Sequence, residues 1–541
     1  MKLGNKMLIT LLATSMIVGC TGCSTSEGKA SGATKAVATS DDIWAPYEET
    51  LTITTVLPEN AGIQWQEGEN YDDNPWYDAY KERFNIQVKN AWVSNDYSTK
   101  LNLTIADGNI PDVFVVNYQQ LQQLKEADLI WDLTEVFDQY ASENIKGYME
   151  LEADTFETAK FDDKLYAIPQ LGYGIIDQPC QVWIRRDWKE QLNLEDPETM
   201  DDLINIAKAF KEEFGGYAMT ENQDLSSLNI LATAWGAQPG IWLEQEDGTI
   251  GYGSIQPEMK EALKTFAQWY QEGIINPEFT VMDMEKMFQD IINGEVGIVP
   301  FYQWFGYQPG PDIITTLGTD AIFDAYAIPT ATGEPVKASI GFGNIGYVVV
   351  NKKFQNPEAV MKLLNFYAYM LDDAYDKGES TEFINSLFNN AYSNIPYALR
   401  VINPMTDYNL FVNVQEALSK GLEEDVSALG TGGIKYSNSV DYIKNGTPEA
   451  VGDYMQMGAP KPAYAIAKEM LDKDLIVKDK VWGRKPETIL NAGSTLNDLL
   501  QEGFTKIIVG QEPIDYFDTL VENWKRAGGE QATKEVNEMN Q

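Results

Sequence analysis

Residues 51–57 read LTITTVL, an alternating run rich in β-branched side chains that predicts a β-strand. A helical stretch, NPWYDAYKERF (74–84), follows it, and IQVKNAWV (86–93) predicts a second strand. The pattern continues with a helix around 97–108 and the apolar strand DVFVVN (112–117). Strands that alternate with helices in this way are typical of a parallel sheet covered by helices, so we expect an α/β fold.

The rest of the chain predicts more helix than strand. TMDDLINIAKAFKEEFGG (199–216) begins with the cap Thr199 and ends at two glycines, and its apolar residues form one stripe. EDGTIGYG (246–253) predicts a tight Asp-Gly hairpin. Further strands are predicted at VGIVPFYQWF (296–305), DAYAIPT (324–330) and NIGYVVVN (344–351), and mainly helix from about 352 onward.

The first 47 residues predict export and tethering. An apolar run (7–18) follows Lys2 and Lys6, and it is too short to span a bilayer comfortably. It ends in IVGC (17–20), which resembles a bacterial lipobox, so we expect a lipoprotein signal peptide over 1–19 and an acyl chain such as palmitate on Cys20. Cys23 fits less well because Cys20 stands where a larger aliphatic residue is usual. An ordinary secretory signal is the alternative. The polar, small residues of 20–47 predict a flexible tether.

Composition excludes several classes of function. The 541 residues carry 40 basic and 82 acidic side chains, a net charge of −42, and such a surface repels nucleic acids. Histidine is absent, which excludes Ser-His and Cys-His catalysis and removes the commonest zinc ligand. Cys180 is the one cysteine beyond the leader region, so no disulfide framework is expected.

Several stretches together resemble one family. They are ADGNIPDVFVVN (106–117), ADLIWDLTEVFDQYAS (127–142), DKLYAIP (163–169), VWIRRDWKEQLNL (182–194), DGTIGYGSIQPEMKEALKTFAQWYQEGIINPEF (247–279), NGEVGIVPFYQW (293–304) and a C-terminal stretch over 495–538. In matching order they resemble the family 1 extracellular solute-binding proteins of ABC importers, which are maltose-binding-protein-like, in the large lipoprotein branch of Gram-positive bacteria. Residues 375–450 resemble this family least.

The resemblance implies a two-lobed α/β fold of the periplasmic-binding-protein type, with discontinuous lobes joined by a multi-strand hinge. We expect the N-terminal lobe to comprise 48–175 and 325–351, and the C-terminal lobe 176–324 and 352–541. The expected crossings lie between KLYAIPQ (164–170) and QVWIRRDW (181–188), between VPFYQWFG (299–306) and DAYAIPT, and after NIGYVVVN.

The resemblance also implies a function. We expect a membrane-anchored, monomeric binding protein on the outer face of a Gram-positive cell, which traps an oligosaccharide between its lobes and delivers it to ABC permease subunits without catalysis. Two other classes stay open: a surface glycoside hydrolase that uses two carboxylates, and a peptide binder or sensor on the same scaffold.

Sugar sites combine aromatic platforms with polar side chains in a cleft. Trp304 is the strongest candidate because it follows a strand at its carboxyl end, where α/β clefts open, and it resembles a stacking tryptophan of the family. Core packing is the alternative interpretation for Trp304 and for Trp235. The other candidate ligand-binding residues are Trp65, Glu59, Asn60, Asn117, Tyr118, Gln119, Tyr173 and Trp242.

No cofactor is expected. EQEDGTIGYGSI (244–255) begins like a calcium loop, but Ile255 stands where a bidentate glutamate is needed. Some members of the family that this sequence resembles carry a structural calcium, so the presence of a calcium ion stays open. The sequence shows no specific metal site.

Overall fold

The computed structural model describes residues 35–61, 63, 65–172, 174–373, 398–426 and 429–540. The expected signal peptide, Cys20, Cys23 and Tyr173 lie outside these described residues. Residues 36–541 form one compact unit, so the folded part begins earlier than predicted.

Residues 36–47 pack onto the fold, where a free tether was expected. Ala36 exchanges two hydrogen bonds with the Asn356 side chain, at 2.9 and 2.8 Å. The Tyr47 hydroxyl donates to Glu358 at 3.1 Å, and its ring is 2% exposed. The Lys362 ammonium donates to the Ile43 carbonyl at 2.9 Å. The composition of this segment alone predicted a tether. Its hydrogen-bonding partners lie more than 300 residues further along the chain, so no local pattern could reveal them.

The first part of the molecule is built on β1 (Leu51–Pro58) and β2 (Ile86–Ser94), which pair in parallel from Leu51 opposite Ile86. The alternation predicted for LTITTVL is present in β1, where Leu51 and Ile53 are buried and Thr52 is exposed. Between these strands lies α1 (Pro75–Phe84), and Asn74 caps it by accepting from the Tyr77 N–H. The predicted strand–helix–strand unit is confirmed.

A second sheet of this part has the order β3-β14-β6, with both outer strands antiparallel to β14. Its strands are β3 (Val113–Val116), β14 (Asn344–Val350) and β6 (Ile168–Leu171), with a short hairpin of β4 (Lys160–Phe161) and β5 (Lys164–Leu165) nearby in sequence. The helices of this part are α2 (Tyr97–Ala106), α3 (Tyr118–Glu126), α4 (Thr134–Tyr140), α5 (Glu143–Leu151), α6 (Ala153–Glu157) and α13 (Ala359–Ala368). The Asp112 carboxylate joins β1 to the start of β3 by accepting from the Thr54 N–H and hydroxyl at 2.8 and 2.7 Å.

The second part is built on a four-stranded sheet of order β12-β7-β11-β8. These strands are β7 (Gln181–Arg185), β8 (Tyr217–Met219), β11 (Val296–Phe301) and β12 (Phe323–Tyr326). β7 is antiparallel to both β11 and β12, whereas β8 is parallel to β11. The predicted Asp-Gly hairpin forms between β9 (Trp242–Glu244) and β10 (Ile250–Tyr252), and β13 (Ala338–Ile340) pairs with β15 (Ile476–Lys478).

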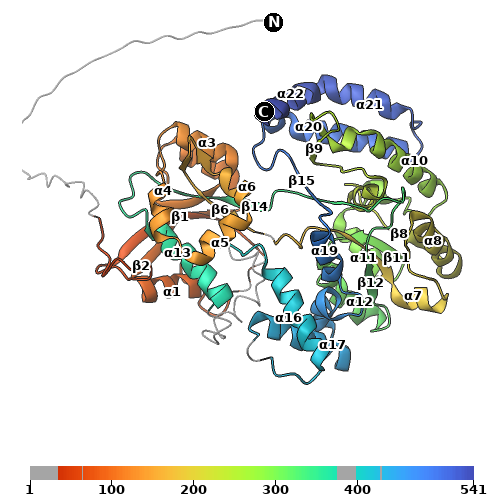
Figure 1. Ribbon diagram of the computed structural model, residues 1–541, viewed down its shortest axis with the longest axis horizontal. Helices are drawn as coiled ribbons and strands as arrows, with labels where there is room; N and C mark the ends of the chain where they lie inside the picture. The colour runs from red at the N-terminus through yellow and green to blue at the C-terminus, as the bar shows by residue number, and fades with distance from the viewer. Residues whose placement is uncertain are drawn as a thin grey trace, which may run out of the picture. The chain divides into compact units, whose positions relative to one another are not determined.

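Helices make up most of the remaining second part (Figure 1). Those before residue 320 are α7 (Arg186–Gln191), α8 (Met200–Phe214), α9 (Ser226–Ala232), α10 (Pro257–Gln271), α11 (Met284–Ile292) and α12 (Gly310–Leu317). Those after residue 405 are α16 (Thr406–Lys420), α17 (Thr431–Asn445), α18 (Val451–Asp453), α19 (Ala463–Asp472), α20 (Glu487–Ile508), α21 (Tyr516–Trp524) and α22 (Glu530–Met539). The predicted cap of α8 is present, since the Thr199 hydroxyl accepts from the Asp202 N–H.

Separate hydrophobic cores divide the chain at different places from those expected. The first core combines residues from 47–171 with residues from 347–401, and α13, drawn in green, lies among red and orange elements (Figure 1). The expected placement in the C-terminal lobe does not hold for 352–370 and 398–401: α13 is buried along its whole length against the first core. The other cores draw on residues 176–328 and 411–536.

The return crossing also lies later than expected. DAYAIPT was assigned to the N-terminal lobe, but Phe323–Tyr326 pairs with β7 in the second sheet. The Arg186 guanidinium binds the Asp324 carboxylate there at 2.5 Å, which fixes β12 beside the start of α7. The chain returns to the first part between Tyr326 and Asn344.

Gly297 on β11 allows a helix to pack closely on the second sheet. A Cβ atom at this position would lie 2.4 Å from Phe210 Cδ2 and 2.6 Å from Trp188 Cε3. We predict that Gly297→Ala lowers the free energy of unfolding by about 1–3 kcal/mol, because these two packed rings cannot move apart without strain.

Gly493→Ala in α20 is the matched control, since its Cβ would meet one atom at an ordinary contact distance of 3.4 Å. It should stabilise the protein by up to about 1 kcal/mol through higher helix propensity. Urea denaturation of the two variants measures both effects. Equal stability of Gly297→Ala and the unsubstituted protein would contradict the close packing.

Candidate ligand-binding site

A large cavity of about 1500 Å³ is lined by elements from both parts of the chain. One face of α5 contributes Glu143, Asn144, Tyr148 and Leu151, and the connection between β6 and β7 contributes Asp177 and Gln178. The remaining described lining comes from Gly147, Gly172, 302–307, 341–342, 371–372, 400–413, 429–435, Gln456 and Tyr464. Segments that are far apart in the sequence therefore meet around one space.

An aromatic wall forms directly after β11. Trp304 lies in a 3-10 turn, Gln303–Gly306, and its ring packs edge-on against Phe301 with centroids 4.6 Å apart. Tyr302 lies nearly parallel to Trp304, with 10° between the planes and 6.5 Å between centroids. Tyr302 is 39% exposed, and its carbonyl accepts from the Trp183 indole N–H at 3.2 Å. The core thus fixes the backbone of two rings that line the cavity.

A buried ion pair supports another part of the wall. The Lys435 ammonium lies 2.7 Å from Asp453 Oδ1 and 2.5 Å from the Tyr307 hydroxyl. The other oxygen of Asp453 accepts from the Asn438 amide at 2.7 Å. Burial alone would lower the pKa of Lys435, but Tyr307 and Asp453 outweigh it and hold this pKa well above its usual value. Lys435 is therefore charged and bound to both Asp453 and Tyr307.

We predict that Lys435→Met lowers the free energy of unfolding by about 3–5 kcal/mol, because it leaves the buried Asp453 carboxylate without its counter-ion. Lys420→Met is the matched control on the neighbouring α16. Lys420 pairs with Glu416 at the surface, at 2.9 Å, and its removal should cost less than about 1 kcal/mol. Chemical denaturation compares them, and similar losses in both variants would refute a structural role for the Lys435 pair.

Two acidic side chains, Asp177 and Asp407, are paired at the cavity. Asp177 accepts from the Tyr464 hydroxyl at 2.7 Å and from the Gly174 N–H at 2.8 Å. Burial and the adjacent charge of Asp177 raise the pKa of Asp407 well above its usual value, and the two side chains are hydrogen-bonded. Asp407 is thus the protonated member, and it donates to the Asp177 carboxylate.

This raised pKa predicts a dependence of stability on pH. A carboxyl whose pKa is higher in the folded state stabilises the fold fully below the unfolded pKa of about 4 and loses that contribution as pH rises through the folded pKa. Asp407→Asn keeps a donor but cannot ionise. We predict that its melting temperature relative to the unsubstituted protein increases between pH 5 and pH 9. A constant difference across that range would contradict the shared proton.

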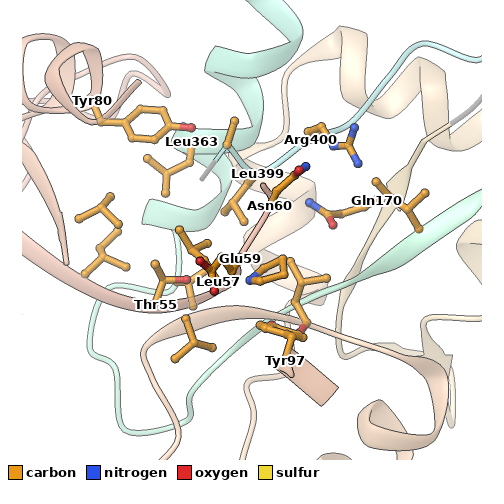
Figure 2. A pocket seen from close by; sticks show the side chains of 18 of the residues that line it. Thr55, Leu57, Glu59, Asn60, Tyr80, Tyr97, Gln170, Leu363, Leu399 and Arg400 are labelled. Carbon is orange, nitrogen blue, oxygen red and sulfur yellow. The ribbon is translucent and has the colours of Figure 1, made fainter. Parts of the chain in front are cut away.

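A smaller cavity of about 470 Å³ lies in the first part, at the end of β1 (Figure 2). Its lining is largely apolar, with Tyr80 and Tyr97 on opposite sides, while Asn60, Gln170 and Arg400 gather at one side (Figure 2). Arg400 lines both cavities.

The structure brings few of the predicted ligand-binding residues together. Trp304 lines the large cavity, whereas Glu59 and Asn60 line the smaller one. Trp65, Tyr118, Asn117, Gln119, Trp235 and Trp242 line neither of these two cavities.

Most of these other residues have structural contacts. The Asn117 side chain caps α3 by accepting from the Gln120 N–H, and Gln119 is exposed on that helix. Tyr118 stacks on Phe161 at 6.3 Å.

The three remaining tryptophans also pack on neighbouring rings. Trp65 packs edge-on against Tyr71, and Trp235 packs edge-on against Phe266. Trp242 is 6% exposed among the rings of the second core, so it is a core residue and offers no open face to a ligand.

The sequence analysis missed most of the cavity lining. Tyr302 and Tyr307 flank the predicted Trp304, and their proximity in sequence was a usable signal. Asp177 and Gln178 lie in the predicted crossing, which also pointed to a site. Residues of 403–435 carried no signal because this region resembled the family least.

The loop over 244–255 forms a hairpin. Asp247 accepts from the Thr249 N–H and hydroxyl at 3.0 and 2.6 Å, which tightens the turn. Within the described ranges no group of three or more acidic or cysteine side chains is arranged to hold a metal ion. In the same part of the chain no helix is long and apolar enough to cross a membrane.

Two parts with separate sheets and cores, several connections between them and a large cavity lined from both parts define a two-lobed periplasmic-binding-protein fold. The family model of the bacterial extracellular solute-binding proteins matches residues 65–368, more than half of the chain, and the chain belongs to this family. The resemblance seen in the sequence is thereby confirmed.

Among similar proteins, the lipoprotein LipO of Bacillus subtilis (strain 168) is 22% identical and aligns over 100% of this chain and 99% of its own. The polygalacturonan/rhamnogalacturonan-binding protein YtcQ of the same organism is 21% identical over 84% of this chain and 85% of its own.

Solved structures share the fold. The alginate-binding protein AlgQ2 has a TM-score of 0.58 at 16% identity, covering 91% of this chain and 98% of AlgQ2. The S. pneumoniae substrate-binding protein FusA in complex with kestose has a TM-score of 0.56 at 18% identity, covering 90% and 98%.

Proposed function

We propose that this protein binds an oligosaccharide in the large cavity and delivers it to an ABC transporter. The observation that carries this proposal is the parallel pair Tyr302 and Trp304 on the wall of a cavity of about 1500 Å³. Aromatic faces bind the apolar C–H faces of sugar rings. The volume exceeds the roughly 300–1,000 Å³ typical of sites for drug-sized molecules, which favours several sugar units over one.

Polar side chains of the cavity suit sugar hydroxyls, which both donate and accept hydrogen bonds. The lining contributes amides and hydroxyls on several elements, namely Asn144, Gln178, Asn403, Thr406, Asn409, Asn413, Thr431 and Gln456. Relatives named for fructooligosaccharide and polygalacturonan binding support the same class of ligand.

Closure around the ligand follows from lining residues in both parts of the chain. Among the described residues, we propose one lobe of 36–171, 344–373 and 398–401, and another of 181–340, 406–426 and 429–540. The two lobes are joined at 172, 174–180, 341–343 and 402–405. A ligand that contacts both lobes shifts the open–closed equilibrium by as much as it prefers the closed form. In this proposal Cys20 carries the lipid anchor, which holds the protein at the extracellular face of the cell membrane. The protein acts as a monomer, and permease subunits are its partners.

The hydrolase alternative receives less support. Glycosidases hold two carboxyl groups about 5–9.5 Å apart with the scissile bond between them. Asp177 and Asp407 instead hydrogen-bond to each other, which leaves no room for a sugar oxygen between them.

We predict that Trp304→Ala weakens binding of the best ligand by about 10- to 100-fold, which corresponds to about 1.4–2.8 kcal/mol. The measurement is titration calorimetry with malto-, xylo-, fructo- and galacto-oligosaccharides of two to six units. Chromatography of the same mixtures detects any shortened product.

Trp235→Ala is the matched control because Trp235 is also half-buried but lies outside the cavity. It should lower the melting temperature and leave affinity within 2-fold. If Trp304→Ala binds all sugars normally, the aromatic wall is not the platform. Binding of peptides with no response to any sugar would refute the proposed function.

A further inference from the structure

Helix α5 presents one face to the first core and another to the large cavity. Ile145 and Met149 are buried in the first core. The start of the helix is anchored there too, since the Ser142 N–H donates to the side chain of Asn365 on α13 at 2.9 Å. The cavity face consists of positions three or four apart, which share one side of a helix: Glu143, Asn144, Gly147, Tyr148 and Leu151. This helix is therefore a fixed part of the cavity wall.

Gly147 lies in the middle of the cavity face, where neither the backbone nor the packing of the described residues requires a glycine. Its backbone is helical, so no left-handed conformation is involved. A Cβ atom at Gly147 would meet no atom of the described residues within 4 Å, whereas at Gly503 of α20 it would lie 2.3 Å from Leu520. Glycine in a helix interior is destabilising relative to alanine, because it loses more conformational freedom on folding. The space beside Gly147 is part of the cavity, whose lining includes this residue.

Leu151 adds an apolar surface on the same face, one turn after Gly147. Its side chain is 54% exposed, and it lines the cavity. Helical side chains lean toward the N-terminus of their helix, so Leu151 extends toward the bare backbone at Gly147. Together the two residues form a shallow apolar step. The C–H face of a sugar ring that packs on this step would be removed from water, which is favourable.

The second lobe supplies Tyr302 and Trp304 to the same cavity. We propose that Gly147 and Leu151 form a separate sugar subsite on the first lobe, in which one ring of the oligosaccharide lies against α5 by its C–H face. This inference rests on the proposed function and gives the first lobe its own contact with the ligand. Such a contact is required for closure, because only a ligand that binds both lobes favours the closed form. A side chain at position 147 would occupy the place of the ring.

Gly147→Ala and Gly147→Leu test this subsite in the full chain. Calorimetry uses the malto-, xylo-, fructo- and galacto-oligosaccharides of the panel above, with the member that binds the unsubstituted protein most tightly as the probe. We expect Gly147→Ala to weaken binding about 3- to 10-fold and Gly147→Leu by at least about 30-fold, because the added carbons displace the ring. The melting temperature should stay the same or rise slightly in both variants, since alanine and leucine are better helix formers than glycine.

Gly493→Ala and Gly493→Leu in α20 are the matched controls, because Gly493 is also a helical glycine and lines neither cavity. Their affinity for the same probe should stay within about 2-fold of the unsubstituted protein. Leu151→Ala removes apolar surface from the subsite without filling it. It should weaken binding about 3- to 10-fold and change the melting temperature little, because the leucine side chain is half-exposed.

The outcomes separate this inference from the proposed function. If a glycan binds the unsubstituted protein and both Gly147 variants with the same affinity, the subsite on α5 is overturned and the sugar-binding function stands. If Gly147→Ala lowers the melting temperature by more than about 3 °C, packing requires the glycine, and the subsite is overturned as well. If no glycan of the panel binds the unsubstituted protein, the proposed function fails, and the subsite fails with it.

Discussion

The carboxylate of Asp177 is the interaction on which the cavity depends. Asp177 lies in the connection that carries the chain from the first sheet to the second, and it binds Tyr464 of α19, 287 residues further along the sequence. It also bonds Asp407 at the start of α16. One buried carboxylate thus connects the segment between the lobes to two C-terminal helices. Burying this group is costly in free energy unless each of its hydrogen-bond donors is present.

An ion pair between Lys435 and Asp453 lies on the helices near this carboxylate. The Asp177 hydrogen bonds and this ion pair explain why the cavity wall is polar and yet rigid. Charged groups that bond to each other do not turn freely toward a ligand. The aromatic pair after β11 is fixed in a different way, through packing of Trp304 on Phe301 and the bond from Trp183. Rigid elements therefore present both kinds of surface, which reduces the entropy lost on binding.

Local sequence patterns predicted the elements well and the division between lobes less well. The strands and helices predicted for residues 51–117 agree with the structure because alternation and capping are local properties. DAYAIPT was placed in the wrong lobe because its partners, β7 and Arg186, lie some 140 residues away. Trp304 lines the large cavity, as expected for a residue at the carboxyl end of a strand, but its role in binding stays a prediction. Trp242 was also predicted to bind ligand, and it is buried in the core. Asp177 was missed since its role depends on Tyr464 and Asp407, which no local pattern connects to it.

The early start of the folded unit limits the distance between this unit and a lipid anchor on Cys20. Residues 36–47 bind Asn356 and Lys362 beside α13, so they cannot extend away from the fold without breaking these bonds. If Cys20 is acylated, as proposed, the distance between the lipid and the folded unit is set by the chain up to residue 35, whose fully extended length is at most about 55 Å, whereas the same limit for a chain up to residue 47 is almost twice as long. A pull from the membrane would reach the first core through α13, and the protein would search for its transporter within a correspondingly smaller radius.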